Sequence, residues 1–241
     1  WNGTTWSALT DNSTGVNGTN NEIRSISFDN NNVMYIGGNF DSAGGKSASR
    51  IATWNGTNWG TLGTGTSGFV QAITITDDFI YAGGNFSIAG GLTVNRITRW
   101  NRSTNSWQKL GEGLTGSVNS MQHDGNHLYV GGAFENASDV ENIFKIMKNV
   151  ARWSDTNGWE ALGTNYTVGF DNSVNTLLFS NDKKNLYAGG NFTTAGNKNA
   201  SNIARWRLLD CAATPLTPEV KINDGNWIDG ATEIELTEGD T

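Results

Sequence analysis

Short runs of alternating apolar and polar residues recur along the chain, separated by segments rich in Gly, Asn and Asp. In the first unit the runs are IRSISF (23–28), VMYIGGNF (33–40), SRIATW (49–54) and WGTLG (59–63). Alternation with a period of two is typical of half-buried β-strands, and DNNN, AGGKS and NGTN between the runs are typical of turns. The pattern predicts four short antiparallel strands in each unit.

The unit is repeated along the chain. The second strand of the first unit contains YIGGNF, and YAGGNF, YVGGAF and YAGGNF follow later. The first glycines of these pairs are Gly37, Gly83, Gly131 and Gly189, so the spacings are 46, 48 and 58 residues. Four antiparallel strands in a repeat of this length are the content of a propeller blade. The predicted fold is therefore an all-β β-propeller built from four-stranded antiparallel blades.

The Gly pair lies inside a strand, where glycine normally weakens the structure. Its recurrence predicts that a neighbouring group approaches closely there, and a bulky Trp from the next strand is the expected group. Tyr35 and Phe40 flank the first pair and are expected to pack between adjacent blades. A phosphate-binding loop needs a strand, a turn and a helix, which the residues around GGNF do not predict.

Paired tryptophans are the second recurrent feature. Nine of the ten tryptophans recur at repeat positions, which favours a place in the blade core over an exposed platform for sugars. The pairs are Trp1 and Trp6, Trp54 and Trp59, Trp100 and Trp107, and Trp153 and Trp159, followed by single residues Trp206 and, in the tail, Trp227.

A Gly pair after a hydrophobic strand, followed by paired Trp, resembles the kelch family of β-propellers. The fuller pattern, YxGGNF with AGG and NIARWNGTNWxxLG, is more similar to the propeller repeats of large secreted and surface proteins. These include bacterial extracellular multidomain proteins, the favoured type, and the fungal Rax2-like cortical markers of cell polarity. The resemblance covers residues 1–206. It implies a fold and an extracellular setting but no single activity, because propellers host unrelated functions.

The repeat also predicts how the chain is divided. Residues 4–10 have the pattern of a fourth strand, so residues 1–10 are expected to complete the last blade and close the ring. Additional blades upstream are the alternative. The predicted blades cover about 21–66, 67–115, 116–167 and 168–206.

After Trp206 the repeat ends. Residues 207–218 contain both prolines and are predicted to be a linker. Residues 219–241 alternate like the first strands of a sandwich and resemble the start of an immunoglobulin-like (Ig-like) module. Such a module needs about 100 residues. We therefore expect the chain to be part of a longer protein, with the Ig-like segment hanging from the propeller.

Composition restricts the partners. The net charge is −7, so the basic surface that nucleic acids or anionic membranes require is not predicted. No apolar stretch approaches the ~20 residues of a membrane helix, so this segment is not expected to insert into a membrane. Cys211 is the single cysteine, which excludes a disulfide framework and a cysteine-rich zinc site within this sequence.

The triplet Asn-x-Ser/Thr, which accepts N-linked glycans in secreted eukaryotic proteins, is frequent. An Asn- and Thr-rich repeat also generates this triplet without any glycosylation, and that simpler interpretation is favoured. The candidate positions are Asn2, Asn12, Asn17, Asn55, Asn85, Asn101, Asn136, Asn165, Asn191 and Asn199.

Candidate catalytic groups are few. His123 and His127 flank the HDGNH turn, but a metal site would need further ligands, and an ordinary hairpin turn is favoured. The acidic turns lack the spacing and final Glu of a calcium loop. Carboxylate pairs for glycoside hydrolysis depend on a separation in space that sequence does not reveal. We predict no catalytic residue, metal or cofactor.

Three long loops fall on one predicted face, namely residues 10–23, 134–153 and 163–174. Loops on a rigid scaffold often carry function, so this face is the predicted ligand site. The alternative is that its apolar residues form a small satellite core. The predicted ligand-binding residues are Phe144, Lys145, Met147, Lys148, Tyr166, Phe170 and Asp171.

These features together predict a non-catalytic extracellular binding or adhesion module within a larger secreted or cell-surface protein. Its expected partners are a protein or glycan ligand at the cell surface and the other domains of the same longer chain. A glycan-active enzyme and a structural spacer of a surface filament are the alternatives. An acidic and aromatic cluster with perturbed titration on one face would favour the enzyme. An exposed polar and aromatic patch alone would favour the binding module, and a spacer would have neither feature.

Overall fold

The computed structural model describes residues 4–138, 144–163, 169–208, 218–221 and 227–228. Within these ranges the regular elements are all β-strands, with no helix. The prediction of an all-β protein is therefore confirmed.

Four antiparallel sheets follow one another along the chain, here called sheets 1 to 4. Sheet 1 has the order β1 (Ile23–Phe28), β2 (Met34–Gly38), β5 (Ile51–Trp54), β6 (Trp59–Thr61). Sheet 2 contains β7 (Phe69–Ile75), β8 (Phe79–Asn85), β11 (Ile97–Asn101) and β12 (Ser106–Gln108). Sheet 3 contains β14 (Ser117–His123), β15 (Leu128–Ala133), β18 (Val150–Ser154) and β19 (Gly158–Ala161). Sheet 4 contains β20 (Val174–Phe179), β21 (Asn185–Gly190), β24 (Ile203–Arg207), β25 (Pro218–Lys221) and β26 (Trp227–Ile228).

Short additional strands lie in the connection between the second and third strands of each sheet. They form the pairs β3 (Ser42–Ala43) with β4 (Lys46–Ser47), β9 (Ile88–Ala89) with β10 (Leu92–Thr93), and β22 (Thr194–Ala195) with β23 (Lys198–Asn199). In sheet 3 the equivalent connection is longer and contains β16 (Asn136–Ser138) and β17 (Phe144–Ile146), with β13 (Gly113–Leu114) beside β16.

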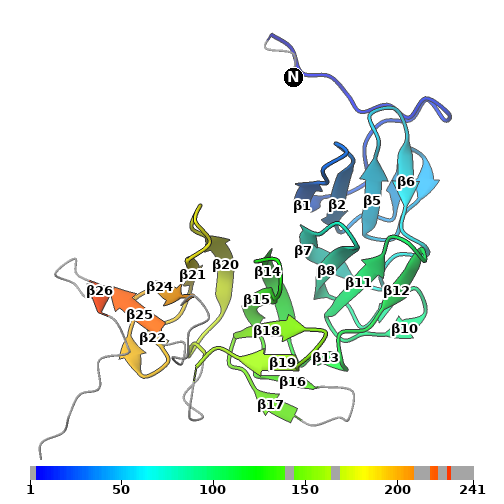
Figure 1. Ribbon diagram of the computed structural model, residues 1–241. Helices are drawn as coiled ribbons and strands as arrows, with labels where there is room; N and C mark the ends of the chain where they lie inside the picture. The colour runs from blue at the N-terminus through cyan, green and yellow to red at the C-terminus, as the bar shows by residue number, and fades with distance from the viewer. Residues whose placement is uncertain (1–3, 139–143, 164–168, 209–217, 222–226, 229–241) are drawn as a thin grey trace, which may run out of the picture.

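The four sheets are arranged in an open arc (Figure 1). The first strands β1, β7, β14 and β20 pack against one another in sequence, so each sheet contacts the next. Within the described strands, β1 and β20 make no comparable contact, and Figure 1 shows the arc open between them.

The recurrent Gly pair is explained by the contact between neighbouring sheets. A Cβ atom on Gly37 would lie 2.4 Å from Cγ1 of Val70, and one on Gly83 would lie 2.4 Å from Cγ1 of Val118. The predicted close approach is confirmed, but the predicted Trp neighbour is wrong. The approaching group is a valine on the first strand of the next sheet, since that strand crosses directly over the glycine.

The tryptophan pairs of sheets 1 to 3 lie in the core, with Trp100 half-buried and the other five side chains buried. The first predicted pair differs, because Trp6 is 85% exposed and Trp1 lies outside the described residues. Within a pair the ring centroids are 5.2 to 5.3 Å apart. The second Trp also links each sheet to the segment before it, because Trp107 Nε1 donates to the Leu62 carbonyl (3.1 Å) and Trp159 Nε1 to the Leu110 carbonyl (2.9 Å).

Residues 4–10 differ from their predicted role as the closing strand of sheet 4. Trp59 of sheet 1 donates its Nε1 to the Leu9 carbonyl at 2.9 Å, and Thr10 bridges Asn17, so this segment lies against sheet 1. The place beside β24 is taken by β25. The predicted closure therefore differs from the structure, because hydrogen bonds hold residues 9–11 at the other end of the arc.

The tail also differs from prediction. β25 pairs with β24 and β26 pairs with β25, so residues 218–221 extend sheet 4 instead of hanging from it as part of a separate module. An unpaired strand edge presents free backbone donors and acceptors, which gives a physical reason for this pairing. The predicted linker falls largely outside the described residues, as does most of segment 219–241.

Candidate functional site

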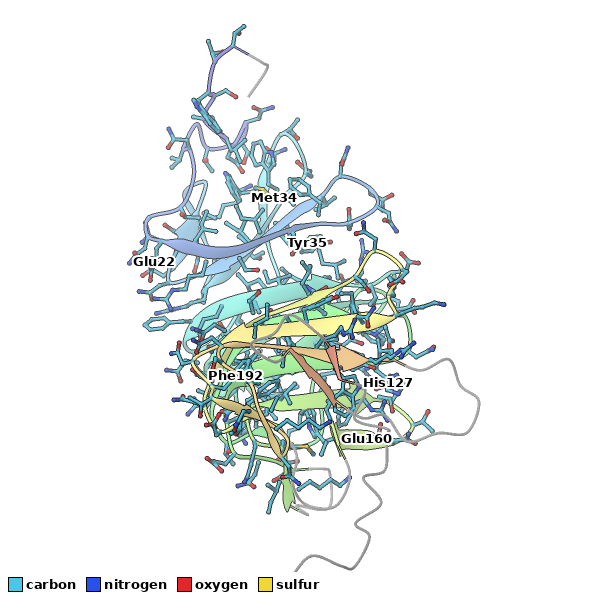
Figure 2. All side chains as sticks on the ribbon, turned by 90° about the vertical axis from the view of Figure 1, so that its left-hand side faces the viewer. Glu22, Met34, Tyr35, His127, Glu160 and Phe192 are labelled. Atoms are coloured by element: carbon cyan, nitrogen blue, oxygen red, sulfur yellow. The ribbon has the colours of Figure 1, made fainter. Side chains whose placement is uncertain are left out.

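The sheets expose loops on two opposite faces. Figure 2 shows Glu22 and Phe192 on one side of the arc and His127 on the other. Glu22 precedes a first strand and Phe192 follows a second strand, so their side is the long-loop face of the sequence analysis. The other side, which we call the hairpin face, carries the turns between first and second strands.

Two apolar residues of the predicted site are buried. Met147 is fully buried in the core of sheet 3. Phe170 is 9% exposed, and its ring centroid lies 4.3 Å from that of Phe192. For these two side chains the structure matches the alternative interpretation, a small satellite core. Burying an apolar loop side chain against the sheets lowers the free energy relative to leaving it in contact with water.

The polar residues of the predicted site hold loops in place. Lys145 Nζ donates to the Trp159 carbonyl at 3.0 Å. The Asp171 carboxylate accepts the Thr193 hydroxyl at 2.5 Å and the Thr194 N–H at 2.8 Å. The Thr193 hydroxyl and then the Thr194 N–H lower the pKa of Asp171 to about 2.

Lys148 is exposed, with a φ of 45°. Phe144 begins β17, and Tyr166 lies outside the described residues. Of the predicted set, Asp171 lines a groove of about 510 Å³ on the long-loop face, together with Glu135 and Asn172, whereas Phe170 lines a separate apolar cavity in sheet 4. The structure therefore does not gather the predicted residues into one site.

A larger polar groove of about 570 Å³ opens on the hairpin face. Its walls come from sheets 2 and 3, and the β20–β21 turn of sheet 4 adds Lys183. The charged and aromatic residues that line it are Asp77, Asp78, Phe79, Tyr81, His123, Trp153, Asp155 and Lys183.

An ion pair between sheets shapes this groove. Arg99 Nη1 of sheet 2 lies 2.7 and 2.8 Å from the two carboxylate oxygens of Asp155 in sheet 3. The guanidinium also stacks over the Phe79 ring, 4.0 Å from its centroid. Since Asp155 is 58% exposed, its carboxylate remains accessible from the groove.

His123 and Tyr81 stack at the base of the groove with ring centroids 5.7 Å apart. Burial lowers the pKa of His123 and raises the pKa of Tyr81. Both shifts favour the neutral form of the side chain at neutral pH, so this pair offers a polar, uncharged surface. Burial between sheets is a sufficient cause, and the shifts do not single out an acid and a base for catalysis.

The two histidines considered for metal binding are part of a hairpin turn. Asp124 Oδ1 accepts the backbone N–H groups of Asn126 and His127 at 2.7 Å each, and His123 Nδ1 accepts that of Gly125 at 3.0 Å. No group of three or more His, Cys, Asp or Glu in the described part of the chain is placed to hold a metal ion. The described ranges also contain no helix that is long and apolar enough to cross a membrane.

Most of the described sequon asparagines lie on the surface. Asn101 and Asn136 are half-buried, while Asn2 and Asn165 lie outside the described residues. In Asn55, Oδ1 accepts the N–H groups of Thr57 (3.0 Å) and Asn58 (2.8 Å), so this sequon also serves as a turn. The exposed positions are Asn12, Asn17, Asn55, Asn85, Asn191 and Asn199.

The sequence analysis missed the hairpin-face groove. A signal was present, because a Tyr on the second strand and an Arg on the third strand recur at repeat positions, as in Tyr81 with Arg99 and Tyr129 with Arg152. Both tyrosines are buried, so the alternation of strand residues alone does not mark these positions as part of a groove. The partner Asp155 belongs to the next sheet, so the pairing depends on how the sheets are packed.

Comparisons with known proteins agree with this architecture. Residues 75–168, less than half of the chain, match the family described as the Rax2 C-terminal beta propeller domain. No curated protein matches the chain.

The computationally designed Ika4 protein is similar in fold, with 16% identity and a TM-score of 0.51, over 85% of this chain and 99% of that one. A chain of the mitotic checkpoint complex also matches, with 15% identity and a TM-score of 0.48, over 81% of this chain and 52% of that one. The repeated four-stranded sheets and the match to a propeller family together identify the chain as an all-β protein of the β-propeller type.

Proposed function

We propose that this chain is a non-catalytic binding module of a larger secreted or cell-surface protein, and that its hairpin-face groove receives a polar protein or glycan ligand. The groove itself is the observation that carries the proposal. It measures about 570 Å³, which lies within the range of ligand pockets.

The chemistry of the groove suits a ligand rich in hydroxyl or amide groups. Asp77, Asp78 and Asp155 supply acceptors, and Lys183 supplies a donor. The half-buried His123 ring, held by its stacking on the buried Tyr81, supplies a flat surface on which an apolar face of a ligand packs. Mixed donors and acceptors on a rigid aromatic base favour recognition, since the groove is formed by strands and short turns instead of long loops.

A binding assay tests the proposal. The chain is applied to immobilised arrays of oligosaccharides and of peptides, and the bound fraction is compared with that of Asp78→Asn combined with Lys183→Asn. Both side chains are exposed. Asn is chosen at 183 because it tolerates the φ of 56° found there. We expect binding to fall roughly tenfold or more, as for loss of polar contacts at a recognition site.

Lys198→Ala removes one charge from the β22–β23 hairpin on the opposite face and serves as the matched control. It should bind like the unmodified chain. Equal binding by the double variant and the unmodified chain would reject the groove as the site. Absence of binding to either array would favour a structural spacer.

A further inference from the structure

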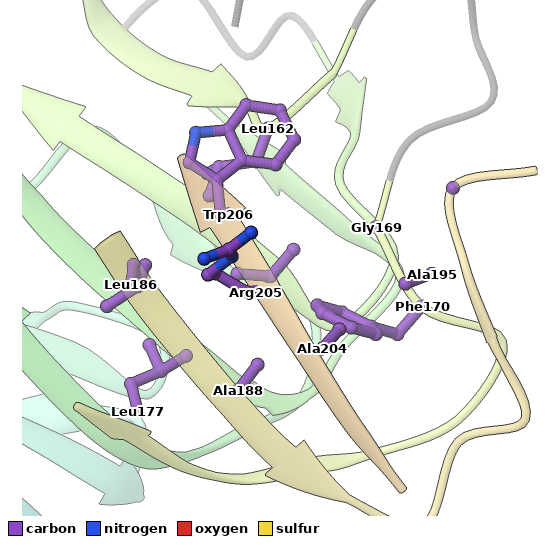
Figure 3. Close-up of a pocket in the computed structure, with 12 residues that line it drawn as sticks. Leu162, Gly169, Phe170, Leu177, Leu186, Ala188, Ala195, Ala204, Arg205 and Trp206 are labelled. Atoms are coloured by element: carbon purple, nitrogen blue, oxygen red, sulfur yellow. The ribbon is translucent and has the colours of Figure 1, made fainter. Parts of the chain in front are cut away.

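An apolar cavity in sheet 4 lies where the other sheets hold a tryptophan. Figure 3 shows Leu162, Phe170, Ala195 and Trp206 around it, and Val150 and Gly196 also line it. At the equivalent place beside sheet 2, Ile51 and Leu62 of the sheet 1 unit and Ala89 pack in one core cluster with Trp107. A Cβ on Gly90 would lie 2.4 Å from the Trp107 ring.

Sheet 4 supplies no tryptophan at this position. Trp54, Trp100 and Trp153 each stand opposite a second Trp in the backbone register, whereas Pro218 stands opposite Trp206. Trp206 Nε1 is buried and has no hydrogen-bond partner within the described chain. The cavity therefore belongs to an incomplete core.

The missing tryptophan is present at the other end of the arc. Residues 6–9 are WSAL, in register with WGTL (59–62), WQKL (107–110) and WEAL (159–162). The Leu9 carbonyl accepts the Trp59 indole at 2.9 Å, as the Leu62 carbonyl accepts that of Trp107. Residues 6–9 thus lie, relative to sheet 1, where the fourth strand of a preceding sheet would lie. The Trp6 side chain is 85% exposed.

A contact between neighbouring sheets joins apolar side chains on the first strand of one sheet to a glycine on the second strand of the sheet before it. One end of the arc exposes such a first strand, and the other end has such a glycine. On β1, Ile23, Ile26 and Phe28 are 40%, 57% and 60% exposed. Their equivalents on β14 include Val118 and Met121, which are 0% and 4% exposed because sheet 2 covers them. At the other end, a Cβ on Gly189 would meet Cγ2 of Thr176 at 3.0 Å instead of a valine of a following sheet.

We propose that two copies of this chain pair head to tail, so that sheet 4 of each copy docks on sheet 1 of the other and the two arcs form one closed ring. Ile23 of one copy seats over Gly189 of the other. Residues 4–10 of that first copy pair with β24 of the other, and Trp6 enters the sheet 4 cavity. The same junction occurs twice, related by the twofold axis of the ring.

A second copy fits better than the chain's own first sheet. The three internal junctions are alike, since the Cβ atoms on Gly37, Gly83 and Gly131 would lie 2.4, 2.4 and 2.6 Å from the following valine. Like junctions set a constant step between sheets, and after three such steps sheet 4 does not reach sheet 1, so the arc stays open (Figure 1).

β25 must leave β24 in this assembly. The pairing between β25 and β24 is short: the register places Arg205 opposite Glu219 and Trp206 opposite Pro218. Proline has no N–H to donate to a neighbouring strand. A strand such as residues 4–10 without proline offers a fuller ladder.

Sedimentation velocity over roughly 1 to 100 µM, a range that brackets moderate affinities, tests the proposal on the 241-residue chain. We expect a concentration-dependent dimer. Trp6→Ala and Ile26→Asp, at two parts of the junction, should each weaken dimerisation by about 30-fold or more. Gly189→Leu should do the same from the opposite end of the arc. Circular dichroism verifies that each variant retains its β-structure.

The control is Leu92→Asp, because Leu92 is 39% exposed on the β10 hairpin and lies away from both ends of the arc. It should dimerise like the unmodified chain. A chain that stays monomeric at the highest concentration would overturn the proposal. So would a dimer that persists in the folded Trp6→Ala, Ile26→Asp and Gly189→Leu variants, or an assembly with a stoichiometry other than two.

Discussion

Gly83 shows how one residue sets the distance between two sheets. A Cβ atom at this position would lie 2.4 Å from Cγ1 of Val118 and 3.1 Å from the sulfur of Met121. Both neighbours are buried, so neither has room to move aside without disturbing the core. At the same repeat position at the end of the arc, a Cβ on Gly189 would meet Thr176 Cγ2 at 3.0 Å and the Asn202 carbonyl oxygen at 3.9 Å, an ordinary contact distance.

Gly83→Ala should therefore destabilise the fold by roughly 1–3 kcal/mol, the usual cost of overpacking a core. Gly189→Ala, the matched substitution, should cost less because its neighbour is a single methyl group. Urea unfolding of both variants in dilute solution measures the difference. If both variants lost the same free energy of unfolding, the contact between sheets would not be the reason why glycine recurs at this repeat position.

Asn149 has a left-handed backbone and a buried side chain. Its φ is 71°, its Oδ1 accepts the Phe134 N–H at 3.1 Å, and its Nδ2 donates to the Phe170 carbonyl at 2.9 Å. Replacement by Gly should lose the hydrogen bonds only, whereas replacement by Ala should also add the strain of a positive φ.

We expect Asn149→Ala to be less stable than Asn149→Gly by about 1 kcal/mol, the lower end of the cost of a left-handed backbone for an L-residue. Thermal unfolding of the two variants checks this order. If both lose the same stability, backbone strain does not contribute here.

The turn formed by residues 11–16 shows how one side chain organises an element. Asp11 is fully buried, and its carboxylate accepts the N–H groups of Ser13 (2.9 Å) and Trp59 (2.7 Å) and pairs with Lys46 Nζ (2.7 Å). These contacts join the turn to the start of β6 and to the β3–β4 hairpin. Lys46, followed by the Ser13 hydroxyl, lowers the pKa of Asp11 well below its ordinary value of 3.8.

A carboxyl with a lowered pKa in the folded state stabilises the fold above its unfolded pKa, and this contribution is lost as the pH falls through the folded pKa. The melting temperature should therefore fall as the pH decreases below about 4. Asp11→Asn should have a lower melting temperature at pH 6 and a smaller decrease on acidification. An identical acid dependence in the variant would show that Asp11 is not one of the groups responsible.

At the scale of the molecule, the sheets form a linear series. Each sheet packs on its neighbours in sequence, so sheets 2 and 3 have two neighbours while sheets 1 and 4 have one each. In arrays of this kind, stability is approximately the sum of the units and their nearest-neighbour contacts. The ends of the arc should therefore open more readily than its middle.

Hydrogen exchange should show this gradient in dilute solution. Amides in β8 and β15 should exchange most slowly, and those in β2 and β21 should exchange faster because their sheets lack one neighbour. Mass spectrometry of proteolytic peptides measures the rates. Uniform protection across all four sheets at low concentration would contradict an open arc of the single chain.

The alternation of apolar residues and the repeat of YxGGNF were sufficient to predict four-stranded antiparallel sheets, because a strand with one buried face needs a period of two and each unit needs the same core. The core position of the Trp pairs in sheets 1 to 3 followed from the same reasoning, but the exposure of Trp6 did not. Sequence also indicated that something approaches Gly83 closely, but the approaching residue, Val118, depends on how the next sheet crosses it.

The sites were beyond the reach of sequence for a related reason. From the sequence alone, Phe170 has the pattern of an exposed loop aromatic, but in the structure its ring packs on that of Phe192. Asp155 lines the hairpin-face groove, which is shaped by its ion pair with Arg99 of another sheet. Residues 4–10 have the pattern of a fourth strand, which local alternation determined. Where they lie was decided by the tertiary structure, since the Trp59 indole holds the Leu9 carbonyl against sheet 1 and the arc is open between sheets 1 and 4.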